Sequence, residues 1–197
     1  GRGRKVIVEY SQPNVGKPFH VGHIRSTIFG QTIKNLLAFA GHDVIGVNYL
    51  GDSGAQVAKL ILGIKRLKKK PAIRDEKELF DYYVAIHKEI EIKPELEKEA
   101  QEILEKIEGG DKSVLKEVRM ITKISLRAFE KNYARLGIRF DETIGESAFI
   151  EEGKKIVGEA LKKGIAFQES DGSVIAKLEE HGLPNTVLLR SNGTTLY

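Results

Sequence analysis

The stretch KVIVEYSQPNVGKPFHVGHIRST, residues 5–27, decides the fold. Its opening run, KVIVEY, is rich in β-branched residues and predicts a buried strand. The Pro, Asn and Gly residues of SQPNVGKP predict a loop after that strand. From about residue 20 to residue 40 apolar residues recur near helical spacing, and Gly41 stands where a helix C-terminal cap belongs. The stretch therefore predicts a strand, a loop and one amphipathic helix.

The same order of elements repeats after Gly41. DVIGVNYL, residues 43–50, predicts a second strand, GDSG a second loop, and residues 55 to about 68 a second helix. Two strands joined by a helix pair in parallel within one sheet, and ligands bind over the carboxyl ends of such strands. Both predicted loops follow the carboxyl ends of their strands and therefore lie on this edge of the sheet. The sequence therefore predicts an α/β fold with a ligand site there.

A longer helical segment follows the second helix. Residues 75–136 are rich in Glu, Lys, Leu and Ile and are broken at Pro94 and at residues 109–111, GGD, which predicts a helical insertion. IRFDETI, residues 138–144, fits a strand that returns to the sheet. The insertion would thus interrupt one sheet.

The remaining residues indicate a different small unit. Residues 151–163 predict a short helix closed by Gly164, and the dipeptides at 171–172 and 192–193 are hairpin-type turns between apolar runs. GTTLY stops where a new strand is due, so we expect the fold to continue beyond it. We divide the chain into a first part of the sheet (1–70), a helical insertion (71–136), a return to the sheet (137–150) and a β-rich connective segment leading into a truncated strand (151–197).

Composition limits the class of protein. The 197 residues, 41% of them hydrophobic, suffice for one substantial core or for one domain with an insertion. The net charge of +4 comes from a mixed charged surface and indicates nucleic acid only weakly. The sequence has no cysteine, which excludes disulfides and thiol chemistry, and it shows neither a signal-peptide core nor a membrane span. We therefore expect a cytoplasmic protein without membrane contact.

Two histidines flank a glycine where the first helix begins. Neither of the two common phosphate-binding loops, GxGxxG and GxxxxGK[ST], occurs, so any bound phosphate would have to be held by other residues. His20 and His23 would share one helix face at a helix N-terminus, where N–H groups and partial positive charge attract anions. Gly22 would let a flat ring approach the backbone. The alternatives are that the histidines are surface or capping residues, or half of a metal site, although HExxH and a third ligand at a recognisable spacing are absent.

The surrounding motifs resemble a known family. The run E-Y-S-x-P-N-x-x-K-P-x-H-x-G-H-x-R-S-T is followed in order by NYLGDSGAQ, YARLGIRFD, GES and GTTLY. Together they resemble the arginyl-tRNA synthetases of class I, whose HIGH signature appears as HVGH at residues 20–23. The resemblance covers nearly the whole chain. It implies the N-terminal part of a catalytic domain, a partial Rossmann-like parallel sheet of the HIGH-type nucleotidyl transferases with a helical insertion and a β-rich connective segment.

The resemblance implies roles for the residues around the HIGH motif. His20 and His23 would contact ATP phosphates and stabilise charge at the attacked α-phosphorus, and Gly22 would lie against adenine. Lys17 corresponds to a lysine that is thought to compensate for a degenerate second signature, KMSKS. Read without the resemblance, Lys17 would be a solvated loop residue.

Four further residues would bind arginine if the resemblance holds. Glu9 matches a glutamate that pairs with the substrate guanidinium, a planar fork of donors suited to a carboxylate. Asn14 and Ser11 resemble loop residues that hold the α-amino and carboxylate groups, and Tyr197 matches a tyrosine beside the arginine side chain. Ser53 stands where the family has Trp in GDWG. The resemblance therefore does not predict how that loop packs, and it assigns no role to Asp52 or Gln56.

The implied reaction joins arginine to tRNA-Arg through arginyl-adenylate, with ATP and Mg²⁺, in a parent enzyme that is a monomer. We expect this chain alone to be inactive because part of the family's site is missing. The alternatives are a small-molecule nucleotidylyltransferase with an HxGH site and a non-catalytic binding module derived from a synthetase. A basic cluster (Lys65, Arg66, Lys68, Lys69 and Lys70) is interpreted as a solvated helix end, with RNA phosphates as its alternative partner.

Overall fold

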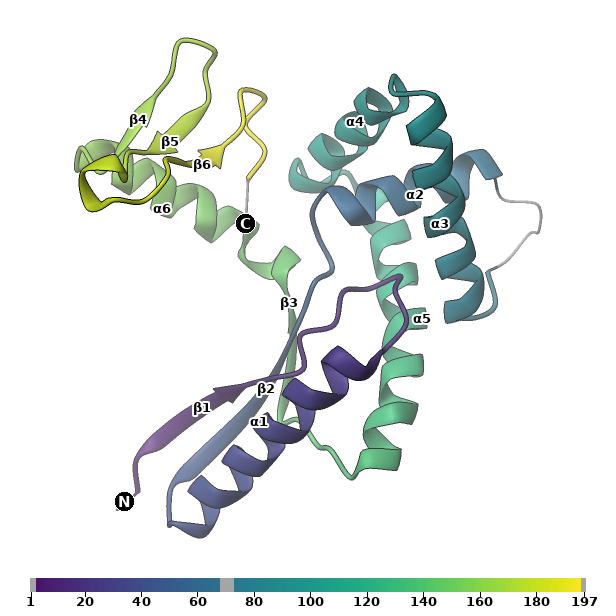
Figure 1. The fold of residues 1–197 in the computed structure, drawn as a ribbon, viewed down its shortest axis with the longest axis vertical. Coiled ribbons are helices and arrows are strands. Elements are labelled where there is room, and N and C mark those ends of the chain that lie inside the picture. Colours follow the sequence, from purple (N-terminus) through teal and green to yellow (C-terminus); the bar gives the residue numbers. More distant parts are fainter. Residues whose placement is uncertain (1–2, 68–72, 196–197) are drawn as a thin grey trace.

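A three-stranded parallel sheet forms the base of the molecule. The structure, a computed structural model, describes residues 3–67 and 73–195. Strand β1 (Lys5–Glu9) pairs with β2 (Asp43–Leu50), and β2 pairs with β3 (Glu142–Gly145), in the order β1-β2-β3. Helix α1 (Val21–Phe39) joins the first two strands and lies against both (Figure 1). The predicted parallel α/β arrangement is confirmed.

The prediction that the first strand is buried is wrong. Alternate residues of β1 are exposed, and the side chain of Ile7 keeps 70% of its accessible surface. β1 is also an edge strand in the described part of the chain, but the exposure of Ile7 comes from a face of the strand that is not covered. A strand that is packed on a single side exposes the residues that alternate onto its other face.

Helix α1 forms where the sequence predicts it, but most of its apolar side is exposed. The helix buries only Thr27 and Gly30. A Cβ on Gly30 would lie 2.1 Å from Cβ of Tyr10, so glycine allows the helix to approach the end of β1 closely. The large apolar residues that remain exposed are Val21, Ile28, Phe29, Ile33, Leu36 and Phe39.

Four helices form the largest core. They are α2 (Ala55–Leu67), α3 (Glu76–Ile92), α4 (Leu96–Glu108) and α5 (Lys112–Leu136). The predicted breaks are confirmed: Gly109 caps α4, the Asp111 carboxylate accepts N–H bonds at the start of α5, and Gly137 ends α5 with φ of 68°. Helix α2 packs with the insertion's helices, whose buried residues are at most 7% exposed. The division of the chain at residue 70 stays a prediction.

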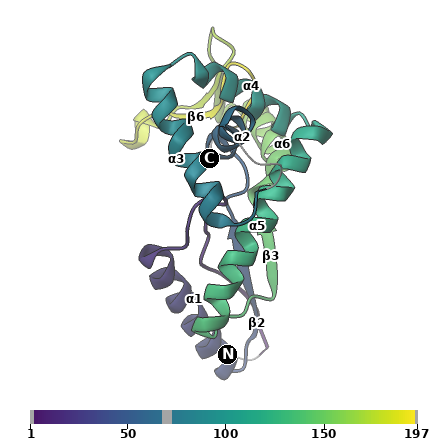
Figure 2. The ribbon, with the colours of Figure 1, turned by 90° about the vertical axis from the view of Figure 1, so that its right-hand side faces the viewer.

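Helix α5 connects this core to the sheet. Its first half contributes Val114, Val118 and Ile121 to the helical core. Its second half places Phe129 and Tyr133 in a second cluster with residues at the ends of β1 and β2. Figure 2 shows α5 descending from the upper helices to the level of α1 and β2.

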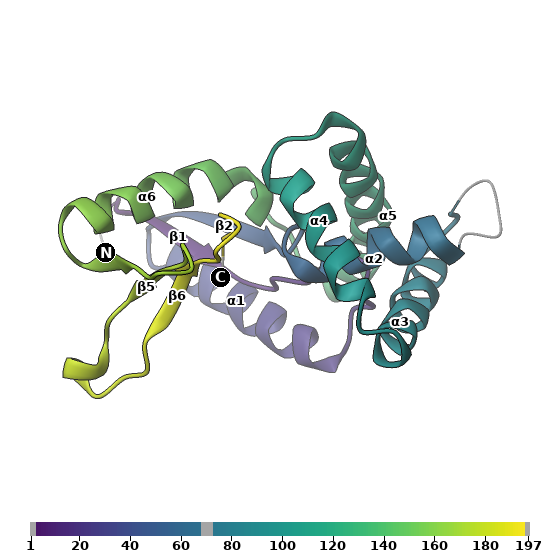
Figure 3. The same cartoon turned by 90° about the horizontal axis from the view of Figure 1, so that it is seen from above.

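A small α/β unit, residues 146–195 and called the connective unit below, completes the described chain. After the short 3-10 turn Glu146–Phe149 come helix α6 (Ile150–Lys162) and the antiparallel strands β4 (Ala166–Gln168), β5 (Val174–Ala176) and β6 (Thr186–Leu189). Figure 3 shows this unit and the helices α2–α5 on opposite sides of the molecule. The predicted helix and hairpin structure are confirmed. None of the helices in the described ranges is long and apolar enough to cross a membrane.

Candidate functional site

The two loops that follow β1 and β2 meet at the carboxyl edge of the sheet. The Val15 N–H donates to the Gly51 carbonyl (3.1 Å), and the Gly51 N–H donates to the Pro13 carbonyl (3.2 Å). Asn14 and Gly51 thus extend the parallel pairing beyond the strands. A Cβ on Gly51 would lie 2.0 Å from Oδ1 of Asn14, so a side chain there would displace Asn14.

The first loop begins with an unfavourable backbone conformation. Ser11 and Gln12 have φ of 81° and 52°, a region that residues other than glycine rarely adopt. Ser11 is buried, with its Oγ 2.8 Å from the Tyr133 hydroxyl and 2.9 Å from the Thr27 hydroxyl. Such backbone strain persists only where surrounding contacts hold it. The contacts of Ser11 with Tyr133 and Thr27 therefore hold the strained loop in place.

His20 and His23 cap the start of α1. The Nδ1 atom of His20 accepts from the Gly22 N–H (3.1 Å), and Nδ1 of His23 accepts from the His20 N–H (3.3 Å). The ring centroids are 3.9 Å apart. The capping interpretation of the pair is thus confirmed. Because each Nδ1 is an acceptor, the hydrogen-bond network assigns the proton of each neutral ring to Nε2, which can donate to an anion.

The surroundings of His23 favour its neutral form. Burial, and then the nearby His20 and Lys17, lower the pKa of His23 below its ordinary value. The Lys17 ammonium lies over the Tyr83 ring, 4.9 Å from its centroid, so the insertion's helix α3 helps to place it. A Cβ on Gly22 would approach Cε1 of His20 to 3.0 Å, and glycine therefore accommodates the His20 ring itself.

A cavity of about 710 Å³ opens beside the meeting loops. Glu9 and Asn14 line it, together with Gln12, whose amide donates to the Glu9 carboxylate. Ser11 is buried within the loop and does not line the cavity, and neither do the residues around the HIGH motif (Lys17, His20, Gly22 and His23). Tyr197 lies outside the described residues.

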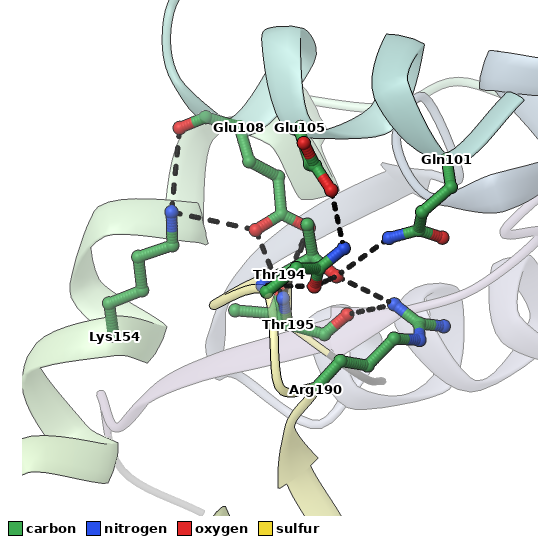
Figure 4. A network of polar contacts seen from close by, with 8 residues as sticks. Gln101, Glu105, Glu108, Lys154, Arg190, Thr194 and Thr195 are labelled. Atoms are coloured by element: carbon green, nitrogen blue, oxygen red, sulfur yellow. Dashed lines mark hydrogen bonds and ion pairs between the residues drawn. The ribbon is translucent and has the colours of Figure 1, made fainter. Parts of the chain in front are cut away.

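The cavity is also lined by residues that sequence reasoning missed. Arg190, Thr195 and Glu108 line it, and Figure 4 shows them within one polar network. Both carboxylate oxygens of Glu108 lie within 3.1 Å of the Thr195 amide nitrogen, and Lys154 Nζ is 3.5 Å from one of them. The GTTLY motif could have drawn attention to Thr195. Glu108 carried no signal, because it is one glutamate among many in a helical segment.

The Asp52 side chain anchors the GDSG loop, residues 51–54. The Asp52 carboxylate accepts from the backbone N–H (2.9 Å) and hydroxyl (2.8 Å) of Ser147. A Cβ on Gly145 would lie 2.1 Å from that carboxylate, so glycine gives it room. Ser53 and Gln56 both line the cavity. Asp52 therefore ties the loop to the segment after β3.

Two sequence alternatives can be compared with the structure. Within residues 3–67 and 73–195, no group of three or more His, Cys, Asp or Glu side chains could hold a metal ion. In the basic cluster, Lys65 pairs with Glu117 (3.4 Å) and Arg66 with Glu89 (3.0 Å). The other members, Lys68, Lys69 and Lys70, lie outside the described residues. The paired cations fit a solvated helix end.

Comparison with known proteins gives a consistent family. Residues 1–197 match the model of the class I (R) tRNA synthetase catalytic domain. Arginine–tRNA ligases from Halothermothrix orenii and Clostridium perfringens are each 38% identical over 199 residues, covering 100% of this chain and 35% of the relative. The chain thus spans about a third of the length of these curated relatives.

Solved structures agree with the sequence comparison. The arginyl-tRNA synthetase of Plasmodium falciparum superposes with a TM-score of 0.79 at 26% identity, covering 98% of this chain and 33% of the other. The Thermus thermophilus arginyl-tRNA synthetase gives 0.74 at 28% identity, covering 100% and 34%. The sheet, the insertion and the connective unit together have the arrangement found in these proteins.

Proposed function

The chain belongs to the family of class I (R) tRNA synthetase catalytic domains, and from this premise we propose that it forms the first part of the catalytic domain of an arginine–tRNA ligase. The parent protein activates arginine with ATP to arginyl-adenylate and transfers it to tRNA-Arg. The observation that carries the proposal is the position of Glu9, at the carboxyl end of β1 and on the wall of the cavity.

The cavity is the proposed arginine site. Glu9 supplies a carboxylate, the natural partner of a planar guanidinium, and Gln12 orients it by donating to Oε1. Asn14 offers an amide to the α-amino or carboxylate group of the substrate. Ser11 contributes indirectly, because its hydrogen bond to Tyr133 holds the strained loop. Tyr197 is proposed to lie beside the substrate side chain. The roles of Glu9 and Asn14 rest on the family resemblance and on the lining of the cavity. The role of Ser11 rests on its hydrogen bonds, and that of Tyr197 rests on the resemblance alone.

The start of α1 is the proposed phosphate site. His20 and His23 present Nε2–H donors beside a helix N-terminus, which attracts anions, and Lys17 adds a positive charge. When the arginine carboxylate attacks the α-phosphorus, pyrophosphate leaves, and fixed donors stabilise the charge that develops on the phosphate oxygens. Gly22 is proposed to lie against adenine.

The donor set fits ATP better than a resident metal. Nδ1 of each histidine accepts a backbone N–H, which leaves Nε2 as the donor, and the described residues hold no cluster of metal ligands. We propose, as the family resemblance implies, that Mg²⁺ arrives with the nucleotide as its counter-ion on the phosphates. We further propose a cytoplasmic location and a monomeric parent enzyme, since the family resemblance implies both.

Calorimetric titration tests the arginine site. The 197-residue chain and the full-length protein are titrated with arginine and with citrulline, which keeps the shape but loses the positive charge. Arginine binding that is lost with citrulline and in Glu9→Gln supports the proposal; equal binding of both ligands by the full-length protein contradicts it. Asp81→Asn, an exposed carboxylate on α3, is the matched control.

Arginine-dependent ATP–pyrophosphate exchange, with tRNA supplied, tests the phosphate site. In the full-length protein His20→Asn and His23→Asn should each lower kcat about 100-fold, since each removes one donor to developing charge. The 197-residue chain alone should give no measurable exchange. Pyrophosphate release with a phosphorylated acceptor, independent of arginine, would instead favour a small-molecule nucleotidylyltransferase.

A further inference from the structure

We propose that Glu108 is a positioning residue for the arginine side of the cavity. It lies on the insertion's helix α4 and holds the turn at residues 192–195, which forms part of the cavity wall. The inference rests on the proposed function, because it assigns Glu108 an effect on arginine binding. Glu108 acts through Thr195 and not on the reacting atoms.

The position of Glu108 is unfavourable for α4 itself. It is the last residue of the helix, where the partial negative charge of the helix end repels a carboxylate. Its side chain is only 4% exposed, and burying a charge costs free energy unless partners replace water. A buried carboxylate at this position therefore needs compensation from outside the helix.

Within the part of the chain that the structure describes, the polar partners of the carboxylate all come from the connective unit. Thr195 donates its backbone N–H and its hydroxyl (3.2 Å), and Lys154 of α6 supplies the opposite charge. Hydrogen bonds to an ionised acceptor are among the stronger ones in proteins. Glu108 thus joins the insertion to two separate points of the connective unit (Figure 4).

Other contacts fix the turn in the same place. Arg190 donates to the Thr194 hydroxyl (3.1 Å) and to the Thr195 carbonyl (3.0 Å), and Asn192 donates to Glu105 of α4 (2.7 Å). Arg190 and Thr195 also line the cavity that Glu9 and Asn14 line from the sheet side. The position of the turn consequently sets one wall of the proposed arginine site.

Loss of the Glu108 carboxylate should weaken arginine binding in two ways. The Thr195 N–H loses its partner, so the wall is no longer held. The Lys154 ammonium loses its counter-charge beside a site that accepts a cation, which adds repulsion to a guanidinium. The phosphate site at the start of α1 has no residue in this network, so ATP binding should be spared.

Exchange kinetics of the full-length protein test the inference. Glu108→Ala should raise the KM for arginine about tenfold and leave the KM for ATP within about twofold. Glu108→Gln keeps one acceptor oxygen for Thr195 and should show a smaller rise, which also guards against a variant that fails to fold. Glu102→Ala removes an exposed carboxylate from the same helix and should match the wild type in both constants.

Amide hydrogen exchange at Thr195 gives a readout without substrate. Its rate should increase about tenfold or more in Glu108→Ala and stay unchanged in Glu102→Ala. Equal rises in both KM values, an unchanged KM for arginine, or unchanged protection of Thr195 would overturn the role of Glu108. If the wild type shows no arginine-dependent exchange, the proposed function fails, and protection of Thr195 still decides whether Glu108 holds the turn.

Discussion

The helical core and the layer of α1 on the sheet differ in how completely they are packed. Buried members of the helical core keep at most 7% of their surface exposed. In α1, by contrast, Leu36 is 62% and Phe39 93% exposed. Both regions have apolar residues at helical spacing. The difference teaches that periodicity identifies the apolar side of a helix but not how much of it the chain covers.

The energetic consequence is an uneven distribution of stability. Burial of apolar surface contributes roughly 25 cal/mol per Å², so α2–α5 should provide most of the folding free energy. The sheet layer is held instead by backbone pairing and by the aromatic cluster around Tyr133 and Phe129. We therefore expect truncation to lower the free energy of unfolding much more in the helical core than in the sheet layer.

Truncation in the helical core should have the largest effect. Ile121 is fully buried between the helices, and Ile121→Ala should lower the free energy of unfolding by about 2–5 kcal/mol through lost contacts and a residual cavity. Urea denaturation gives the change. Ile92→Ala, at an exposed site on α3, is the control and should cost far less. Equal losses would break the comparison.

The junction of the two regions should respond less strongly. Tyr133→Phe leaves Nδ2 of buried Asn48 without its partner and removes a bond at Ser11, so we expect a loss of about 1–3 kcal/mol. A double-mutant cycle with Ser11→Ala measures the coupling between the two hydroxyls. Additive losses would show that Tyr133 does not hold the strained loop.

Local signals in the sequence predicted most of the elements and the edge where the loops meet. The breaks at Pro94, Gly109 and Gly137 follow from helix-ending chemistry, and the parallel pairing follows from alternating strands and helices. The exposure of β1 could not be predicted, because a hydrophobic strand looks the same whether one or both of its faces are covered.

In the candidate site, too, the sequence predicted some residues from local motifs and missed others. Glu9 and Asn14 lie within one continuous motif, and the structure brings both to the cavity. Glu108 and Arg190 reach the same cavity from positions about a hundred and more residues away, through tertiary packing that no local pattern encodes. Gln12 stood inside the motif, but only its side-chain bond to Glu9 reveals its position.

Acid should weaken the sheet layer selectively through Asp141. Lys34 (2.6 Å) and the Gly46 N–H (2.6 Å) lower the pKa of Asp141 below its ordinary value. The folded-state pKa is below the unfolded one, so this stabilisation is present above the unfolded pKa and is lost as pH falls through the folded pKa. Asp141 is half exposed, and Asp141→Asn should cost about 1 kcal/mol near neutral pH.

Denaturation of the wild type and Asp141→Asn between pH 7 and pH 2 measures this effect. The difference in unfolding free energy should stay constant down to about pH 4 and then shrink. Glu152→Gln, which removes a surface ion pair on α6, is the matched control and should show little difference at any pH. A difference that grows on acidification would contradict the assignment.

Substitution on the open side of α1 should have the smallest effect. Leu36→Gln and Phe39→Ser exchange side chains that are already mostly in water, so each should change the unfolding free energy of the 197-residue chain by less than about 0.5 kcal/mol. Thr27→Val, at a fully buried position on the same helix, should cost more because it removes the hydroxyl beside Ser11. If Leu36→Gln instead costs as much as a core truncation, this side of α1 is covered in solution, and the contrast with the helical core disappears.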